Sequence, residues 1–278
     1  MTQDPKVSAP RAPRAKVTAP AIVDLKRRGE VISVVTAYDF PTARLADEAG
    51  VEIVLVGDSL GTVVLGYDST LPVTMADMLH HVRAVTRARP SALVVADLPF
   101  MSYQVSVEQA VENAGRMVQE GGADAVKLEG GERILPAVQR IIEIGIPVMG
   151  HLGLTPQSVL AFGGYRVQAR GEADQERLLV EAKRLEQAGC FSIVLEGIPS
   201  RLGTQVSREL TIPTIGIGAG PGCDGQVLVT HDLLGLYHGR TPKFVRRYAE
   251  LGDATRRAFE QYVADVKAHR FPADSESY

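Results

Sequence analysis

The chain has 278 residues, of which 45% are hydrophobic, and its formal net charge is −3 at pH 7. This length allows one large α/β barrel or two ordinary domains, and the small negative charge argues against nucleic acid or an anionic membrane as a partner. The two cysteines, Cys190 and Cys223, exclude a disulfide framework and suggest a reducing compartment. We expect both to be structural.

The first residues mix proline, alanine and basic side chains and lack the apolar centre of a secretory signal. We expect residues 1–21 to form a disordered or extended tail, with organellar targeting as an alternative. Residues 22–278 are expected to form a single domain with a helical C-terminal extension. Because no apolar run approaches the roughly 18 residues that span a bilayer, we expect a cytoplasmic protein with no membrane partner.

Strand-like and helix-like stretches then alternate along the chain. Eight short runs rich in valine, isoleucine and leucine are predicted as strands: VVTAYD, IVLVGDS, LVVADLPF, AVKLEG, PVMGHLG, FSIVLEGI, TIPTIGIGAG and QVLVTHDLL. The stretches between them predict helices, which parallel strands require as crossovers. This pattern favours an α/β fold, a (β/α)8 TIM barrel. An open doubly wound sheet is the alternative, but no GxGxxG motif follows the first run, and GIGAG comes late.

Local signals give the expected helix boundaries. Pro41 to Gly50, Thr74 to about Arg89 and Ser106 to Gly121 carry start and stop residues at the right spacing. Further helices are expected from an N-cap at Asp174 to Gly189, from about Gln205 to Leu210, and from Lys243 to about His269. The long stretch LTPQSVLAFGGYRVQARGEADQ after the fifth strand suggests a lid or binding loop.

Carboxylates stand at the ends of strands two, three and four. In a barrel these strand ends converge on one mouth, where like charges need a compensating cation. The oxygen ligands of Asp58, Asp97 and Glu129 suit Mg²⁺, although Mn²⁺ or Co²⁺ would also fit. In the alternative interpretation, each carboxylate caps the following helix or pairs with a basic residue.

Other ionisable residues end the same runs. Lys127 lies two positions before Glu129 and so faces the same way; it could hold a substrate anion, form a Schiff base, or make a structural ion pair. His151 could bind substrate, transfer protons, or bond to the backbone at the rim. Glu196 ends an apolar run, where burial suits a general base, unless it caps the next helix. Together they suit proton abstraction beside a metal-chelated α-keto acid, followed by attack on a carbon electrophile that the pattern does not name.

Several blocks of the sequence resemble one family, the ketopantoate hydroxymethyltransferases, from Thr36 to the FPAD that begins at Phe271. The blocks that carry the resemblance are TAYD, VGDS, GYDST, ADLPF, VKLEGG, HLGLTPQS, LEGIP and PTIGIGAG. The resemblance implies a barrel of the phosphoenolpyruvate/pyruvate type. It also implies transfer of a hydroxymethyl group from 5,10-methylenetetrahydrofolate to 3-methyl-2-oxobutanoate, giving 2-dehydropantoate in the first step of pantothenate biosynthesis. Mg²⁺, one per subunit, and a homo-oligomer, typically a homodecamer, are implied as well.

The resemblance also assigns roles by motif. It implies Glu196 as the catalytic base that takes the C3 proton. Metal ligands would be Asp58, Asp97 and Glu129, and substrate contacts would come from Asp58, Ser59, Asp97, Lys127 and His151. The folate site is not located; Tyr165 and Arg166 are a guess.

Two other functions stay open. Another metal-dependent barrel enzyme could cleave or rearrange C–C or P–C bonds, but the chain lacks the Cys-containing KKCGH block of isocitrate lyases. A non-enzymatic sensor or scaffold on the same fold would be expected to have lost the charged residues of the mouth, all of which are present.

Overall fold

The computed structural model describes residues 14–236 and 241–278. The chain divides into two compact units, one ending at Val227 and the other running from Leu228 to Tyr278. The first unit contains the barrel and almost the whole of its eighth strand. Residues 1–13, which belong to the predicted N-terminal tail of residues 1–21, lie outside the described residues.

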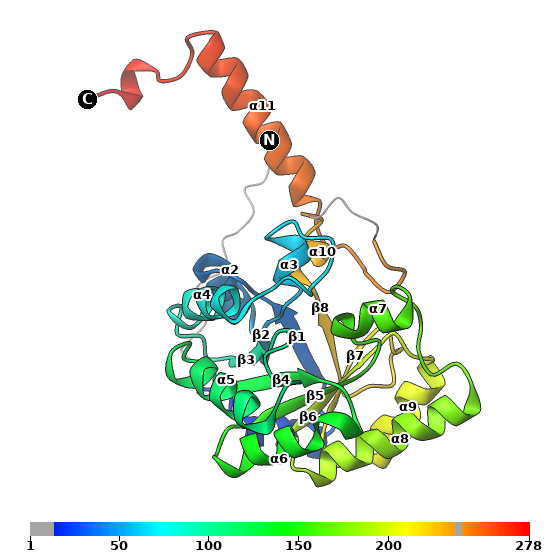
Figure 1. Cartoon of the computed structure of the whole chain (residues 1–278). Coiled ribbons are helices and arrows are strands. Elements are labelled where there is room, and N and C mark those ends of the chain that lie inside the picture. The colour runs from blue at the N-terminus through cyan, green and yellow to red at the C-terminus, as the bar shows by residue number, and fades with distance from the viewer. Residues whose placement is uncertain (1–13, 237–240) are drawn as a thin grey trace. The chain divides into compact units, whose positions relative to one another are not determined.

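Eight parallel strands close into a barrel in chain order, which confirms the predicted (β/α)8 fold and shows that the open-sheet alternative was wrong. Figure 1 shows these strands with their helices outside. The strands are β1 (Ile32–Thr36), β2 (Ile53–Val56), β3 (Leu93–Asp97), β4 (Ala125–Glu129), β5 (Val148–Gly153), β6 (Ser192–Glu196), β7 (Thr214–Ile217) and β8 (Gly225–Leu228). Each strand is shorter than the predicted run: β1, for example, stops before Asp39, β7 stops before Gly218, and β8 stops before a short helix.

The principal crossover helices are α2 (Phe40–Ala49), α4 (Met75–Thr86), α5 (Val107–Gln119), α6 (Leu135–Glu143), α8 (Glu172–Gln187) and α9 (Ser200–Glu209); α3 (Leu60–Val63) and α7 (Val159–Phe162) are single turns. The side chains of Thr74 and Ser106 cap α4 and α5 as predicted. The expected cap at Asp174 was wrong: α8 starts earlier, so this carboxylate lies in the first turn, where it favours the helix dipole. Helix α9 likewise starts at Ser200, ahead of the predicted Gln205.

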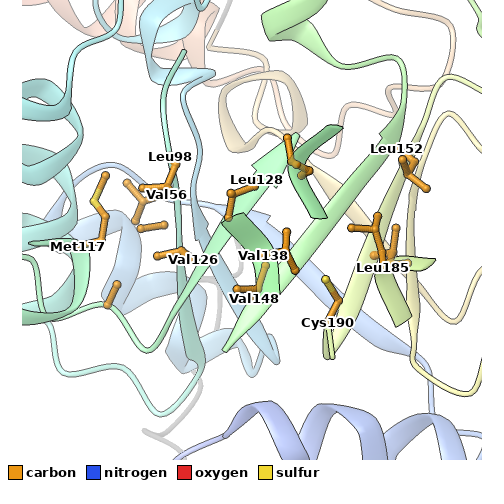
Figure 2. Close-up of a cluster of buried hydrophobic side chains, with 14 of the residues drawn as sticks. Val56, Leu98, Met117, Val126, Leu128, Val138, Val148, Leu152, Leu185 and Cys190 are labelled. Carbon is orange, nitrogen blue, oxygen red and sulfur yellow. The ribbon is translucent and has the colours of Figure 1, made fainter. Parts of the chain in front are cut away.

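Alternation along the strands sorts side chains into two apolar clusters. Outward-facing residues meet the helices, and Figure 2 shows Val126, Leu128 and Val148 beside side chains such as Met117 and Leu185. The inward-facing residues form a second cluster inside the barrel: Ile32, Val34, Ile53, Leu55, Leu93, Val95, Ala125, Met149, Val194, Ile215 and Val227. Because the period is two, the next inward positions on β3 to β6 are those of the ionisable residues.

Helix α1 (Ala19–Arg27) closes the inner cluster. Ala19 and Ile22 are buried among the inward-facing strand residues. The ammonium group of Lys26 donates to the carbonyls of Ser207 and Ile212 at 2.7 and 3.0 Å, and it lies 2.9 Å from Asp224 Oδ2. Apolar burial and a cation that binds carbonyl groups together fix this helix to the barrel.

The stretch before α1 is extended and bound to the barrel unit. Lys16 donates to the carbonyls of Pro90 and Ala92, and Val17 N donates to Ser91 O at 2.7 Å. The domain boundary expected between residues 21 and 22 therefore falls inside α1. Residues 14–18 are held on the barrel unit because basic side chains there donate to carbonyl groups.

The second unit holds α10 (Thr230–Leu233), α11 (Leu251–Lys267) and a final 3-10 turn at Asp274–Glu276. Helix α11 is shorter at both ends than the predicted stretch 243–269. Among the residues described, no helix is both long and apolar enough to cross a membrane. Cys190 and Cys223 are buried free thiols, and burial raises the pKa of Cys190 to about 12, in keeping with a structural role.

We expect Ile22→Ala to lower the free energy of unfolding by about 2–5 kcal/mol, because it empties a buried position beneath the barrel. Thermal and urea unfolding followed by circular dichroism measure the change. Val31→Ala is the matched control, since that side chain is 76% exposed and should change stability by no more than about 0.5 kcal/mol. Equal effects of the two substitutions would show that α1 does not stabilise the barrel.

Candidate active site

The barrel brings the predicted ionisable residues together at the C-terminal ends of its strands. Asp97, Lys127, His151 and Glu196 face inward, and Asp58 follows β2 directly. Register explains part of this arrangement, because Asp97 pairs with Lys127 across β3 and β4, and Glu129 pairs with His151 across β4 and β5. All of these side chains are buried except that of Glu196, which is 15% exposed.

The ammonium group of Lys127 lies at the centre of the cluster. Its Nζ is 2.9 Å from Asp97 Oδ1 and 3.2 Å from His151 Nδ1. Burial lowers the pKa of Lys127, but the charges of Asp97, Glu129 and Asp58 outweigh this and raise it above its ordinary value. The structural partner is therefore Asp97 and not Glu129. A Schiff base needs the neutral amine, so this environment favours anion binding over covalent catalysis.

His151 links two carboxylates. Its Nδ1 lies 3.4 Å from Glu129 Oε1, and its Nε2 lies 3.3 Å from Glu196 Oε2. Burial and the charge of Lys127 lower the pKa of His151, but the neighbouring carboxylates of Glu129 and Glu196 raise it to about 9. The imidazole thus lies between two site carboxylates, which argues against the interpretation that it merely bonds to the backbone at the rim.

None of the four site carboxylates caps a helix. Ser59, Gly131 and Pro199 occupy the N-cap positions after β2, β4 and β6, and α5 is capped by Ser106. The capping interpretation of these carboxylates was therefore wrong. The side chains are instead held by one another and by nearby donors, which is an arrangement that proteins rarely keep without a function.

Asp58 and Ser59 extend the cluster toward β1. The amide N–H of Asp58 donates to Asp97 Oδ2 at 3.1 Å. The hydroxyl of Ser59 lies 2.8 Å from that of Tyr38, a buried residue just after β1. This contact orients the half-buried serine beside the carboxylates, and the sequence analysis had not singled out Tyr38.

Two further buried residues, Gln157 and Tyr103, were also missed. Gln157 Nε2 donates to Asp58 Oδ2 and to Leu98 O, each at 2.9 Å, and Gln157 N donates to Glu129 Oε2 at 2.9 Å. The Tyr103 hydroxyl accepts from Glu129 N at 3.1 Å and donates to Gln157 Oε1 at 2.7 Å. A neutral polar residue in a loop leaves no pattern of charge by which a sequence analysis could identify it. Gln157 lies within the block HLGLTPQS, but nothing in that block marks it as a site residue.

Negative charge exceeds positive charge in this site. Among the described residues, the carboxylates of Asp58, Asp97, Glu129 and Glu196 lie beside two basic groups, Lys127 and His151. Burial and the charges of Glu129 and Asp97 raise the pKa of Asp58 well above its ordinary value. For Glu129, burial acts in the same direction, but bonds to His151 and the charges of His151 and Lys127 lower the pKa overall.

Excess charge and hard oxygen donors fit a small divalent cation chemically. Over residues 14–236 and 241–278, however, no three His, Cys, Asp or Glu side chains stand as a preformed metal cluster. Lys127 and Gln157 contact oxygens of the same carboxylates. Each contact uses one oxygen of its carboxylate, Asp97 Oδ1 for Lys127 and Asp58 Oδ2 for Gln157.

Tyr165 and Arg166 do not join the cluster. Both are exposed, in the loop after α7. This loop is attached next to Glu196, because Gln168 N donates to Gly197 O at 2.9 Å. The structure therefore places the loop near the mouth but leaves the guess about folate untested.

A protein-family model described as ketopantoate hydroxymethyltransferase matches residues 16–274. A 3-methyl-2-oxobutanoate hydroxymethyltransferase of Moorella thermoacetica is 58% identical over 267 residues, which cover 96% of this chain and 99% of that protein. One of Syntrophus aciditrophicus is 59% identical, covering 95% and 97% of the two chains.

Solved structures share the fold at low identity. A 2,3-dimethylmalate lyase, described as a member of the PEP mutase/isocitrate lyase superfamily, superposes with a TM-score of 0.60 at 17% identity, covering 94% of this chain and 88% of that one. A phosphonopyruvate hydrolase gives a TM-score of 0.62 at 12% identity, with 95% and 93% covered. These likenesses show that the chain shares the barrel fold of these proteins.

We expect Lys127→Met to lower the free energy of unfolding by about 3–5 kcal/mol, because it leaves buried carboxylates without their cation. The double variant Lys127→Met/Asp97→Asn should recover part of that loss, since one of the unpaired charges is removed with it. Urea unfolding of the four proteins in the cycle measures both effects. Arg44→Met, which removes an exposed pair with Glu48, is the control. A double variant no more stable than the single one would contradict the assigned pairing.

Proposed function

The chain belongs to the ketopantoate hydroxymethyltransferase family, and we propose that the buried cluster at its barrel mouth carries out the family's reaction. The protein is an enzyme that transfers a hydroxymethyl group from 5,10-methylenetetrahydrofolate to 3-methyl-2-oxobutanoate. The product is 2-dehydropantoate, in the first step of pantothenate biosynthesis. Identity above 50% over nearly the whole chain supports this activity.

The relatives weigh against the two alternative functions. The lyase and hydrolase structures share only the fold with this chain, at 17% and 12% identity. A sensor or scaffold would have no need to keep three buried carboxylates and the half-buried Glu196 beside Lys127 and His151, because the desolvation of these groups costs stability.

We assign Asp58, Asp97 and Glu129 as the residues that would hold Mg²⁺, one ion per subunit. The support is the excess of buried negative charge and the oxygen donor set of these side chains. When bound, the ion would polarise the keto group of the substrate. Mn²⁺ or Co²⁺ would meet the same donors.

Binding of the keto acid is assigned to Asp58, Ser59, Asp97, Lys127 and His151. The protonated amine of Lys127 would attract the substrate carboxylate, and Asp97 holds that amine in place at 2.9 Å. The Ser59 hydroxyl, oriented by Tyr38, would donate to a substrate oxygen. The low dielectric of the buried site strengthens these interactions.

Glu196 is assigned as the base. Its carboxylate is the most exposed of the four, so a substrate at the mouth could reach it. It would take the proton from C3, and the electrons of the C–H bond would form the C2–C3 double bond of an enolate. His151, 3.3 Å away, would stabilise the charge of Glu196 before the proton moves. Water would cleave both C–N bonds of the methylene bridge, so that tetrahydrofolate leaves with the two protons of the water and the one-carbon unit becomes an aldehyde. The enolate carbon would then bond to this aldehyde carbon, whose oxygen takes up a proton and becomes the hydroxyl group.

Assembly and location follow from the same family. We propose a homo-oligomer, a homodecamer, in the cytoplasm, without nucleic acid or membrane as a partner. Self-association is supported by α11, which has no buried residue although Phe259 and Tyr262 are 65% and 55% exposed. Such an apolar surface favours contact with another protein chain.

Enolisation is the step that tests the assignment of Glu196. In D₂O, the wild-type protein with Mg²⁺ should erase the C3 proton signal of 3-methyl-2-oxobutanoate in proton NMR without the folate donor. Glu196→Gln should slow this exchange and lower turnover by about 10²-fold or more, with keto acid affinity largely unchanged. Glu176→Gln, on the exposed face of α8, should behave as wild type. Near-normal exchange by Glu196→Gln would remove the residue from this role.

The metal assignment predicts that Asp58→Asn weakens keto acid binding in the presence of Mg²⁺ but has little effect without it. The physical reason is that the amide keeps the shape of the carboxylate and loses its charge. Isothermal calorimetry with and without Mg²⁺ measures the difference. Asp68→Asn, an exposed change ten residues further along the chain, is the control. Equal affinities of Asp58→Asn and wild type with Mg²⁺ would contradict the assignment.

A further inference from the structure

Gln157 occupies an unusual place for a neutral side chain. It is 6% exposed and lies in the 3-10 turn Pro156–Ser158 that follows β5. Its side chain reaches Asp58 and the carbonyl of Leu98, which follow β2 and β3, while its own backbone N–H bonds to Glu129 on β4. One residue therefore contacts the ends of three neighbouring strands.

The hydrogen bonds of the Gln157 amide are complete. Nε2 donates its two hydrogens to Asp58 Oδ2 and Leu98 O, and Oε1 accepts from the hydroxyl of Tyr103 at 2.7 Å and from Gln104 Nε2 at 3.0 Å. An amide has two donors and two acceptor sites, so none is left unused. Rotating the group by 180° would set its oxygen against a carboxylate and a carbonyl, and its nitrogen against the Gln104 donor. The partners thus fix its orientation.

Tyr103 extends the same network. Its hydroxyl donates to Gln157 Oε1 and accepts from the backbone N–H of Glu129. Tyr103 is 3% exposed, so little water is available to replace these bonds. The neutral side chains of Gln157 and Tyr103 consequently link the carboxylate of Asp58 to the backbone of Glu129.

We infer that Gln157 is a positioning residue for the divalent ion: its side-chain amide holds the carboxylate of Asp58 beside that of Glu129, which its backbone N–H binds, and Tyr103 supports the amide. This inference rests on the proposed function, which assigns those carboxylates to the metal. Gln157 acts through the two carboxylates. Residues of this kind set ligand orientation, and their loss commonly lowers metal affinity 10- to 100-fold.

The experiment uses Mn²⁺ as an EPR-visible probe of the oxygen site, titrated into the full-length protein. Gln157→Met keeps the length of the side chain but cannot donate a hydrogen bond, and it should weaken Mn²⁺ binding about 10- to 100-fold. With saturating Mg²⁺ and keto acid, kcat should stay within about threefold of wild type, while the KM for 3-methyl-2-oxobutanoate rises and that for the folate does not. Tyr103→Phe, which removes one oxygen atom, should give a smaller loss of Mn²⁺ affinity.

Ser207→Ala is the control for general destabilisation. Its buried hydroxyl donates to Gly203 O at 2.7 Å, away from the mouth, so the variant should lower the melting temperature without changing Mn²⁺ affinity. If Gln157→Met does not fold, Tyr103→Phe decides: unchanged Mn²⁺ affinity would overturn the inference.

Failure of the inference can be told apart from failure of the proposed metal site. Suppose that the wild-type protein binds Mn²⁺ and that Asp58→Asn abolishes this binding. If Gln157→Met and Tyr103→Phe then leave the Mn²⁺ affinity unchanged, the role of Gln157 alone is overturned. A wild-type protein with no Mn²⁺ site, or one that Asp58→Asn does not affect, would overturn the metal assignment and the inference together. Selective loss of Mn²⁺ affinity in both variants would support both.

Discussion

Strict alternation of side chains along a strand is the constraint on which this molecule depends. When parallel strands close into a barrel, one set of positions faces the helices and the other fills the interior. Here the interior set begins with residues such as Ile53 and Val95 and ends with Asp97, Lys127 and Glu196. The same periodicity therefore builds the apolar interior and delivers the charged groups to one end of it.

The two ends of the barrel carry out different tasks. At the N-terminal end, α1 covers the apolar interior, and Lys26 satisfies carbonyl groups that would otherwise lack a donor. At the C-terminal end, polar groups replace apolar ones. This division is typical of TIM barrels, in which stability residues gather at one face and chemistry at the other.

Burying carboxylates at the C-terminal end of the barrel costs free energy of desolvation, and two kinds of interaction offset part of that cost. Lys127 and His151 compensate part of the carboxylate charge directly. Gln157 adds neutral hydrogen bonds, from its side chain to Asp58 and from its backbone to Glu129, and Tyr103 donates to the Gln157 side chain. The charge that is still uncompensated is the physical reason for assigning a divalent ion, and it connects the fold to enolate chemistry, which needs positive charge beside a developing oxyanion.

The sequence by itself determined the number and order of the strands, because each hydrophobic run is short and bounded by turn residues. It also determined the identity of the charged residues, since Asp58, Asp97, Lys127, Glu129, His151 and Glu196 end such runs.

The pairing of these charged side chains was decided by the tertiary structure. Lys127 contacts Asp97 on the neighbouring strand and not Glu129 on its own, because register and rotamer are set only when the barrel closes. The positions of Gln157, Tyr103 and Tyr38 were likewise decided there, since a neutral side chain in a loop leaves no periodic signal. Lys16, in the stretch before α1, donates to the carbonyl groups of Pro90 and Ala92. Composition alone cannot reveal such partners, because they lie more than seventy residues further along the chain.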